Sequence, residues 1–125
     1  TLAPPPNLDP KWWGPHTGYT LAKMGMSLVT LGLGEEFKGR VAVNALWPKT
    51  VIATDAINMI PGVELSACRK PDIVADAAVA ILQQAFTAAS GHFYIDETVL
   101  AATGIRDFDA YAVQPGNRLL PDLFL

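Results

Sequence analysis

Two residues able to carry proton-transfer chemistry lie four positions apart near the start of the chain. Tyr19 and Lys23 belong to the segment HTGYTLAKMGMS, which contains no carboxylate and no arginine. On a helix, residues four apart are neighbours, with Cβ atoms roughly 5–6 Å apart. An ammonium that close to a phenol favours the phenolate, so we expect the pKa of Tyr19 to fall from about 10 toward the working pH.

A phenol with a lowered pKa suits acid/base catalysis at a carbonyl. It can donate a proton to the carbonyl oxygen while hydride arrives at the carbon, and it can accept that proton in the reverse direction. The lysine ammonium could also hold a ribose hydroxyl. A bare Tyr-x-x-x-Lys pattern recurs by chance, so the pattern alone leaves open a purely structural pair on one helix face.

The two residues lie in a segment that predicts a long helix. Residues 16–38 are rich in Ala, Leu and Met, contain no proline and precede Gly39, a residue type that often ends helices. Apolar side chains go almost all the way round this helix, which indicates burial on several sides or packing against a partner subunit. Residues 4–15 hold five prolines and predict a loop. We expect Trp12 and Trp13 in this loop either to anchor it to the rest of the protein or, for one of them, to line a substrate pocket.

The remaining sequence predicts further alternation of strands and helices. The expected elements are a buried strand over 40–47, a loop with short helical pieces over 51–67, a helix over 71–86, a strand over 92–96 and a helical turn around 99–103. The order helix-strand-helix-strand, with connections long enough for parallel crossovers, predicts an α/β fold. Because two parallel strands do not form a stable sheet alone, we expect half of a doubly wound, Rossmann-type sheet.

Composition narrows the classes of partner and setting. The 125 residues are 50% apolar, with a mean hydropathy of +0.25, so some apolar surface is expected to be covered from outside the chain. A net charge of -3 without a basic run argues against nucleic acid and an anionic membrane as partners. The lone Cys68 favours a reducing, cytoplasmic setting, and no uninterrupted apolar run reaches transmembrane length. No signal peptide is visible at Thr1, and the opening TLAPPPN is expected to be the middle of a longer chain.

Several segments together resemble the short-chain dehydrogenase/reductases. In that family a Y-x-x-x-K helix is followed by a strand ending V-N-x-[apolar]-x-P-G and then by an apolar-x-Thr element over the nicotinamide. The corresponding segments are YTLAKMGM, then FKGRVAVNALWPKTVIATDA, with SGHFYIDE matching the last core strand. NALWPKT, CRKPDIVADAA and the tail GIRDFDAYAVQPG extend the likeness to one branch of the family over essentially the whole chain.

The resemblance implies an oxidoreductase that uses NAD or NADP on a small-molecule carbonyl or alcohol. Tyr19 is then the acid/base, and Lys23 tunes it and binds the nicotinamide ribose. The resemblance gives further cofactor contacts to Pro48, Val51, Ile52 and Thr54, and substrate contacts to Ala3, Trp13 and Met59. It also implies that residues 1–125 are the C-terminal part of one domain, which is complete only with its N-terminal half. Within this part, residues 53–67 or so are expected to form a substrate lid. The whole protein is expected to form a homo-oligomer.

Three departures from the family pattern stand out, and the missing serine and the missing Gly-rich loop favour an alternative. The family places a serine thirteen residues before the tyrosine, where this chain has Pro6, or Ala3 if the loop is longer, and Thr1 is the nearest hydroxyl. The usual Pro-Gly is Pro48-Lys49, and the Ile52-x-Thr54 element lies one residue later than in the family. No Gly-rich strand-turn-helix precedes Tyr19 to hold a pyrophosphate. The alternative is therefore a non-catalytic scaffold or interaction module.

Overall fold

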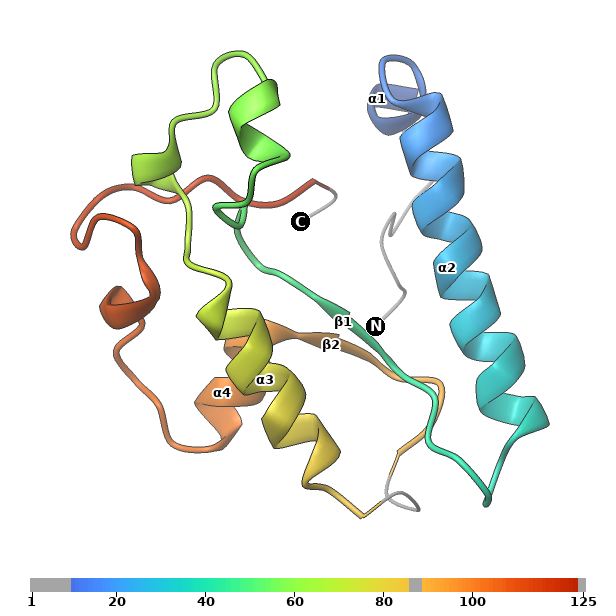
Figure 1. The fold of residues 1–125 in the computed structure, drawn as a ribbon. Coiled ribbons are helices and arrows are strands. Elements are labelled where there is room, and N and C mark those ends of the chain that lie inside the picture. Colours follow the sequence, from blue (N-terminus) through green and yellow to red (C-terminus); the bar gives the residue numbers. More distant parts are fainter. Residues whose placement is uncertain (1–9, 86–88, 124–125) are drawn as a thin grey trace. The chain divides into compact units, whose positions relative to one another are not determined.

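A computed structural model of the chain describes residues 10–85 and 89–123 (Figure 1). Its helices and strands are α1 (Pro10–Trp13), α2 (Thr17–Glu36), β1 (Ala45–Trp47), α3 (Asp72–Leu82), β2 (Phe93–Ile95) and α4 (Asp96–Ala102). Strands β1 and β2 form a two-stranded parallel sheet. The predicted α/β class and order of elements are confirmed.

The chain divides into two compact units, and the division passes through the strand pair. The first unit contains residues 10–45 and 84–94 of the described chain, with α1 and α2. The second contains residues 46–83 and 95–123, with α3, α4 and three short 3₁₀ turns, at Ile57–Met59, Leu65–Ala67 and Asp109–Tyr111. Within the described ranges, no helix combines the length and apolar character needed to cross a bilayer.

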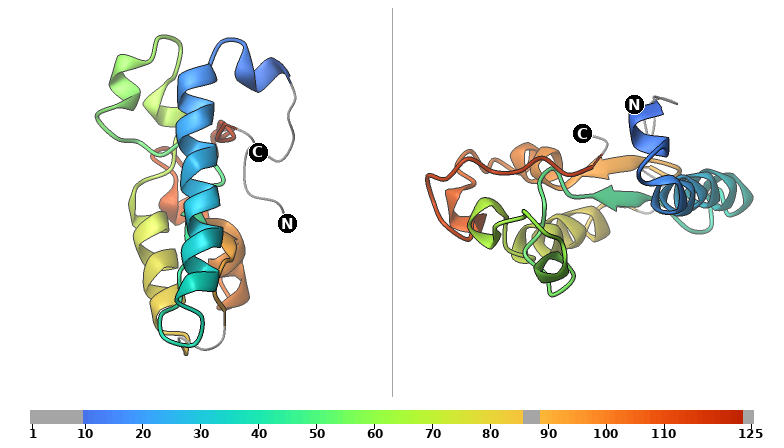
Figure 2. Two further views of the ribbon diagram at one scale, coloured as in Figure 1. Left: turned by 90° about the vertical axis from the view of Figure 1, so that its right-hand side faces the viewer. Right: turned by 90° about the horizontal axis from the view of Figure 1, so that it is seen from above.

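Helix α2 dominates the first unit and is shown from the side and end-on in Figure 2. Its buried positions are small or polar, namely Thr20, Ser27, Thr30 and Gly34. Ser27 Oγ donates a hydrogen bond to the carbonyl of Lys23 (3.3 Å) and Thr30 Oγ1 to that of Met26 (2.9 Å), so both hydroxyls find partners within the helix. The large apolar side chains of α2 are exposed in this unit, including Leu21, Met26, Leu28, Val29 and Leu31.

The narrow buried stripe of α2 ends where Gly34 meets the turn before β2. A Cβ at Gly34 would lie 2.9 Å from the nitrogen of Gly91 and 3.3 Å from Ser90 Oγ. The Ser90 hydroxyl donates to the Gly34 carbonyl (3.2 Å) and accepts from the amide of Val43 (3.1 Å). The absence of a side chain at Gly34 therefore permits backbone contact between the helix and this turn.

The strand predicted over residues 40–47 is wrong in extent, because regular pairing begins only at Ala45. Asn44 Nδ2 donates to the carbonyl of Ala89 (3.1 Å), and Asn44 Oδ1 accepts from the amide of His92 (2.9 Å). These side-chain bonds replace the ladder that would have continued the strand. The preceding residues are tied to the turn before β2 without being part of the sheet.

The second unit has its own core between α3 and α4. Its fully or nearly buried apolar side chains are Trp47, Cys68, Ile73, Ala77, Val99, Leu100 and Ala112. Helix α4 begins at Asp96, earlier than the predicted turn around 99–103, because a carboxylate in the first turn complements the helix dipole. The loop predicted over 4–15 is wrong at Pro10–Trp13, where proline's preset φ suits the first position of a helical turn.

Candidate active site

Tyr19 and Lys23 lie on one face of α2, as their spacing predicts. The Lys23 ammonium nitrogen is 5.4 Å from the centroid of the Tyr19 ring, which is within the range of a cation–π contact. Tyr19 keeps 45% of its surface exposed, and Lys23 is half-buried. Gly18, the residue before Tyr19, has open space where a Cβ would lie. The phenol of Tyr19 is therefore exposed beside an ammonium.

The residues expected to contact cofactor from the segment after β1 belong to the second unit. Pro48, Val51 and Ile52 are half-buried, whereas Thr54 is exposed. These residues lie in one segment, residues 48–54, which directly follows β1. Carboxyl ends of strands are where doubly wound sheets place ligands.

This segment is held by backbone hydrogen bonds on both sides. The amide of Val51 donates to the carbonyl of Leu120 (3.0 Å), and the amide of Ala53 donates to the carbonyl of Arg69 (2.8 Å). In return the amide of Arg69 donates to the carbonyl of Val51 (3.0 Å). Such pairing gives a loop the rigidity that a binding segment needs.

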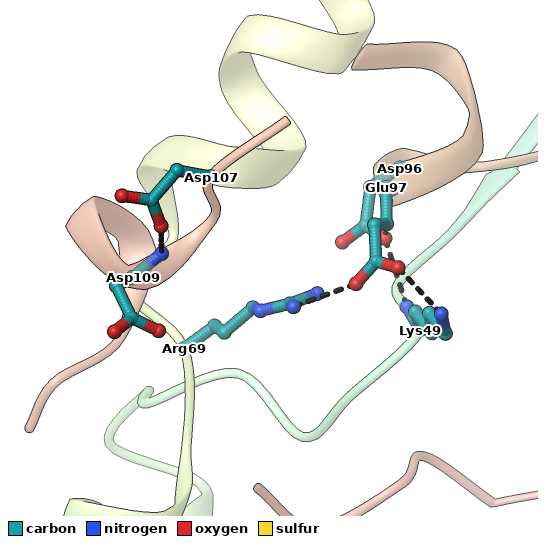
Figure 3. A network of polar contacts seen from close by, with 6 residues as sticks. All are labelled: Lys49, Arg69, Asp96, Glu97, Asp107 and Asp109. Carbon is teal, nitrogen blue, oxygen red and sulfur yellow. Dashed lines mark hydrogen bonds and ion pairs between the residues drawn. The ribbon is translucent and has the colours of Figure 1, made fainter. Parts of the chain in front are cut away.

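Four charged residues surround the start of this segment (Figure 3), and sequence reasoning missed them as a group. Glu97 Oε1 is 2.5 Å from Lys49 Nζ, and Glu97 Oε2 is 2.6 Å from Arg69 Nη2. Asp96 Oδ1 accepts from the backbone amides of Lys49 (2.9 Å) and Glu97 (2.6 Å). The available signal was the acidic pair at the end of the strand predicted over 92–96, but nothing local identified its partners.

The two acidic residues respond in opposite directions to their surroundings. Burial raises the pKa of Asp96, against the opposing effect of the amides of Lys49 and Glu97 and of the charge on Arg69. Burial alone would raise the pKa of Glu97 as well, but hydrogen bonds and charge from Lys49 and Arg69 outweigh it and hold that pKa below its usual range. Glu97 is therefore the ionised hub of the group.

The remaining predicted site residues are dispersed. Met59 lies in the 3₁₀ turn Ile57–Met59 of the second unit and is 83% exposed, within the expected lid. Trp13 ends α1 in the first unit, is half-buried, and its carbonyl accepts a hydrogen bond from Thr17 Oγ1. The predicted positions Ala3, Pro6 and Thr1 lie outside the described residues.

Two acidic side chains, those of Asp107 and Glu97, have bonding partners within the protein. Asp107 Oδ1 accepts from the amide of Asp109 (2.9 Å), as drawn in Figure 3, and Glu97 is paired with Lys49 and Arg69. Across residues 10–85 and 89–123, no group of three or more His, Cys, Asp or Glu side chains could hold a metal ion.

The amino-acid sequence of the chain is similar to those of several known proteins. No protein-family model matches the chain. It is 57% identical over 125 residues to hydroxysteroid dehydrogenase-like protein 2 of Danio rerio and 55% identical over 128 residues to the Homo sapiens protein of that name. This confirms the likeness to one branch of the family. The chain spans about 30% of the length of these relatives.

Solved structures give the same result in three dimensions. A crystal structure of a candidate dehydrogenase from Xanthomonas campestris matches the whole chain with a TM-score of 0.91 and 66% identity, and the chain covers 46% of it. A short-chain dehydrogenase from Mycobacterium thermoresistibile matches 98% of the chain with a TM-score of 0.82 and 40% identity, with 44% of that protein covered. The chain matches the C-terminal portion of the fold of these neighbours.

Proposed function

Because the chain is related over its whole length to the short-chain dehydrogenase/reductases, we propose that it supplies the catalytic half of an NAD(P)-dependent oxidoreductase. The substrate is a small molecule with a carbonyl or alcohol group. The observation that carries the proposal is the contact between Tyr19 and Lys23, with the ammonium 5.4 Å from the ring centroid of a tyrosine that remains exposed.

Tyr19 is the acid/base in this proposal. Its hydroxyl holds a proton that it gives to the substrate oxygen in reduction and takes back in oxidation. The positive charge of Lys23 favours the ionised phenol and is also suited to binding ribose hydroxyls. When bound, a nicotinamide cofactor supplies or accepts the hydride.

The segment over 48–54 fits the nicotinamide end of a cofactor. It is pinned by the backbone bonds of Val51 and Ala53, and Thr54 is exposed and offers a hydroxyl. Pro48, Val51, Ile52 and Thr54 are the residues that we propose to contact the cofactor there. The pyrophosphate requires a Gly-rich turn, which the N-terminal half of the domain is proposed to supply.

Substrate and setting follow from the same proposal. The expected lid over about 53–67 presents Met59 and Ile60 as exposed apolar side chains, which suits a hydrophobic carbonyl compound. Trp13 and Ala3 are proposed as further substrate contacts. A cytoplasmic setting agrees with a lone, buried Cys68.

A non-catalytic scaffold is the second candidate, and one sequence observation favours it. Pro6 and Ala3 stand where the family has a serine that polarises the carbonyl. Loss of such a donor costs about 2.7–4 kcal/mol of transition-state stabilisation where it has been measured. Retention of Tyr19 with Lys23 favours the enzyme.

Turnover by the full-length protein separates these candidates. We expect oxidation of NADH or NADPH with a panel of hydrophobic aldehydes and ketones, and Tyr19→Phe should lower kcat/KM by about 10²–10⁴-fold because the transferable proton is lost. Tyr94→Phe is the matched control, since the same hydroxyl is removed from β2, and it should retain activity within a few fold. Failure of the wild-type protein to turn over with either cofactor would favour the scaffold.

A further inference from the structure

Glu97 joins the proposed cofactor-binding segment, residues 48–54, to the neighbouring chain at Arg69. One of its carboxylate oxygens binds Lys49 Nζ at 2.5 Å, and the other binds Arg69 Nη2 at 2.6 Å (Figure 3). Lys49 lies within this segment, directly after Pro48. Arg69 exchanges backbone hydrogen bonds with Val51 and Ala53 on the same segment. A single carboxylate thus connects the start of the loop to the chain that runs beside it.

Asp96 reinforces the connection at the same residue, Lys49. Its side chain is fully buried, and Oδ1 accepts from the backbone amide of Lys49 at 2.9 Å and from that of Glu97 at 2.6 Å. Lys49 is therefore held at two points, by its backbone through Asp96 and by its ammonium through Glu97. The two bonds restrain both the backbone and the side chain of Lys49 at the start of the segment.

The energetics favour a positioning role for these charges over a stabilising one. Arg69 is only 6% exposed, so its ion pair with Glu97 has lost most of its hydration. Buried ion pairs commonly add little net stability relative to apolar residues of similar volume, whereas in some proteins they select one geometry. The Arg69 guanidinium also lies 5.5 Å from the centroid of the Phe108 ring, which restricts it further.

We propose that Glu97, supported by Asp96, is a positioning residue that holds residues 49–54 in the conformation that receives the nicotinamide end of the cofactor. This inference rests on the proposed function. Tyr19 and Lys23 belong to α2 and to neither segment that Glu97 joins. Loss of the network should therefore weaken cofactor binding while the proton-transfer step is largely preserved.

The test uses the full-length protein and two variants that differ in their risk to folding. Glu97→Gln removes the charge from the hub, and Lys49→Met removes only one side-chain bond at a residue whose side chain is 52% exposed. We expect each variant to raise the Kd and the KM for NADH or NADPH by about tenfold or more. The value of kcat should change by less than about threefold. Lys49→Arg keeps the cation and should bind cofactor as the wild type does.

A matched control removes a different hydrogen-bonded carboxylate of the same unit. Asp76 accepts a hydrogen bond from the Tyr111 hydroxyl at 2.8 Å, so Asp76→Asn should leave cofactor affinity unchanged. Equal weakening by Asp76→Asn and Glu97→Gln would overturn the proposal, because it would show a general loss of stability. Wild-type affinity in both folded network variants would overturn it as well.

Amide hydrogen exchange without cofactor separates this inference from the proposed function. The amides of Val51 and Ala53 are hydrogen-bonded in the structure, and we expect them to exchange faster in Glu97→Gln and Lys49→Met but not in Asp76→Asn. Unchanged exchange in the network variants would overturn the positioning role itself. A wild-type protein that binds neither nicotinamide cofactor would instead overturn the proposed function, and with it the cofactor as the ligand of this loop.

Discussion

At the scale of single residues, α2 and α4 each place a charged side chain in contact with another functional group. The Lys23 ammonium lies over the Tyr19 ring, and the Glu97 carboxylate lies between Lys49 and Arg69. The first pair follows from helical geometry alone, because residues four apart share a face. The second depends on segments that meet only in the folded chain.

The opposite pKa directions of Glu97 and Asp96 predict a pH-dependent contribution to stability. The pKa of Glu97 is lowered on folding, so its stabilising effect is present above its ordinary value of 4.5 and is lost as the pH falls through the folded value. The pKa of Asp96 is raised above its ordinary 3.8, so its contribution is present at low pH and is lost as the pH rises through the folded value.

We therefore expect Glu97→Gln to destabilise the protein more at pH 7 than at a pH near 4. Urea unfolding of the wild-type and variant proteins at both values measures this difference. Asp76→Asn provides the comparison, since Asp76 lies outside the Glu97 network. A gap between wild type and Glu97→Gln that stays constant across the two pH values would contradict the assignment of Glu97 as an ionised hub.

At the scale of elements, the helices were predicted better than the strands. The helix predicted over residues 16–38 is observed as Thr17–Glu36, and the one predicted over 71–86 is observed as Asp72–Leu82. Local composition and end signals determine such helices. The strand predicted over 40–47 shrinks to Ala45–Trp47, because pairing depends on a partner that the local sequence does not contain.

A substitution at Gly34 tests how closely α2 packs on the turn before β2. Gly34→Ala should destabilise the protein by about 1 kcal/mol or more, because the added Cβ would lie 2.9 Å from the nitrogen and 3.0 Å from Cα of Gly91. Helix propensity alone predicts the opposite sign, since Ala is favoured over Gly by about 1 kcal/mol.

Gly32→Ala is the control for Gly34→Ala on the same helix. A Cβ at Gly32 would meet nothing within 4 Å, so this change should leave stability equal or higher. Thermal or urea unfolding of both variants measures the two effects. If Gly34→Ala were as stable as Gly32→Ala, the close approach of the helix and the turn would be wrong.

At the scale of the whole molecule, α2 presents apolar residues that the described chain does not bury. Leu21, Met26, Leu28 and Val29 are 57–63% exposed. The buried stripe of the helix is instead formed by Thr20, Ser27, Thr30 and Gly34. An exposed apolar face of this kind indicates a covering surface, either the N-terminal half of the domain or a second copy of the protein.

We expect the full-length protein to be a homo-oligomer that uses this face of α2. Val29→Glu should lower its mass in solution to that of a monomer, because burial of a carboxylate in an apolar interface is costly. Val79→Glu, which places the same charge on an α3 residue that is 53% exposed, should keep the oligomer. Light scattering measures the masses of both variants and of the wild type. A monomeric wild type, or a Val29→Glu variant that is an unfolded monomer, would indicate instead that the N-terminal half of the same chain covers this face of α2.

The sequence by itself determined what depends on neighbours along the chain. Helical spacing placed Lys23 against Tyr19, and the order of periodic segments predicted an α/β chain with too few strands for a sheet of its own. Only the tertiary structure decided that Glu97 pairs with Lys49, 48 residues away, and that the small face of α2 is the buried one. The physical reason is that ion pairs and buried faces depend on which distant segments pack together, and apolar residues all round a helix cannot indicate its inner side.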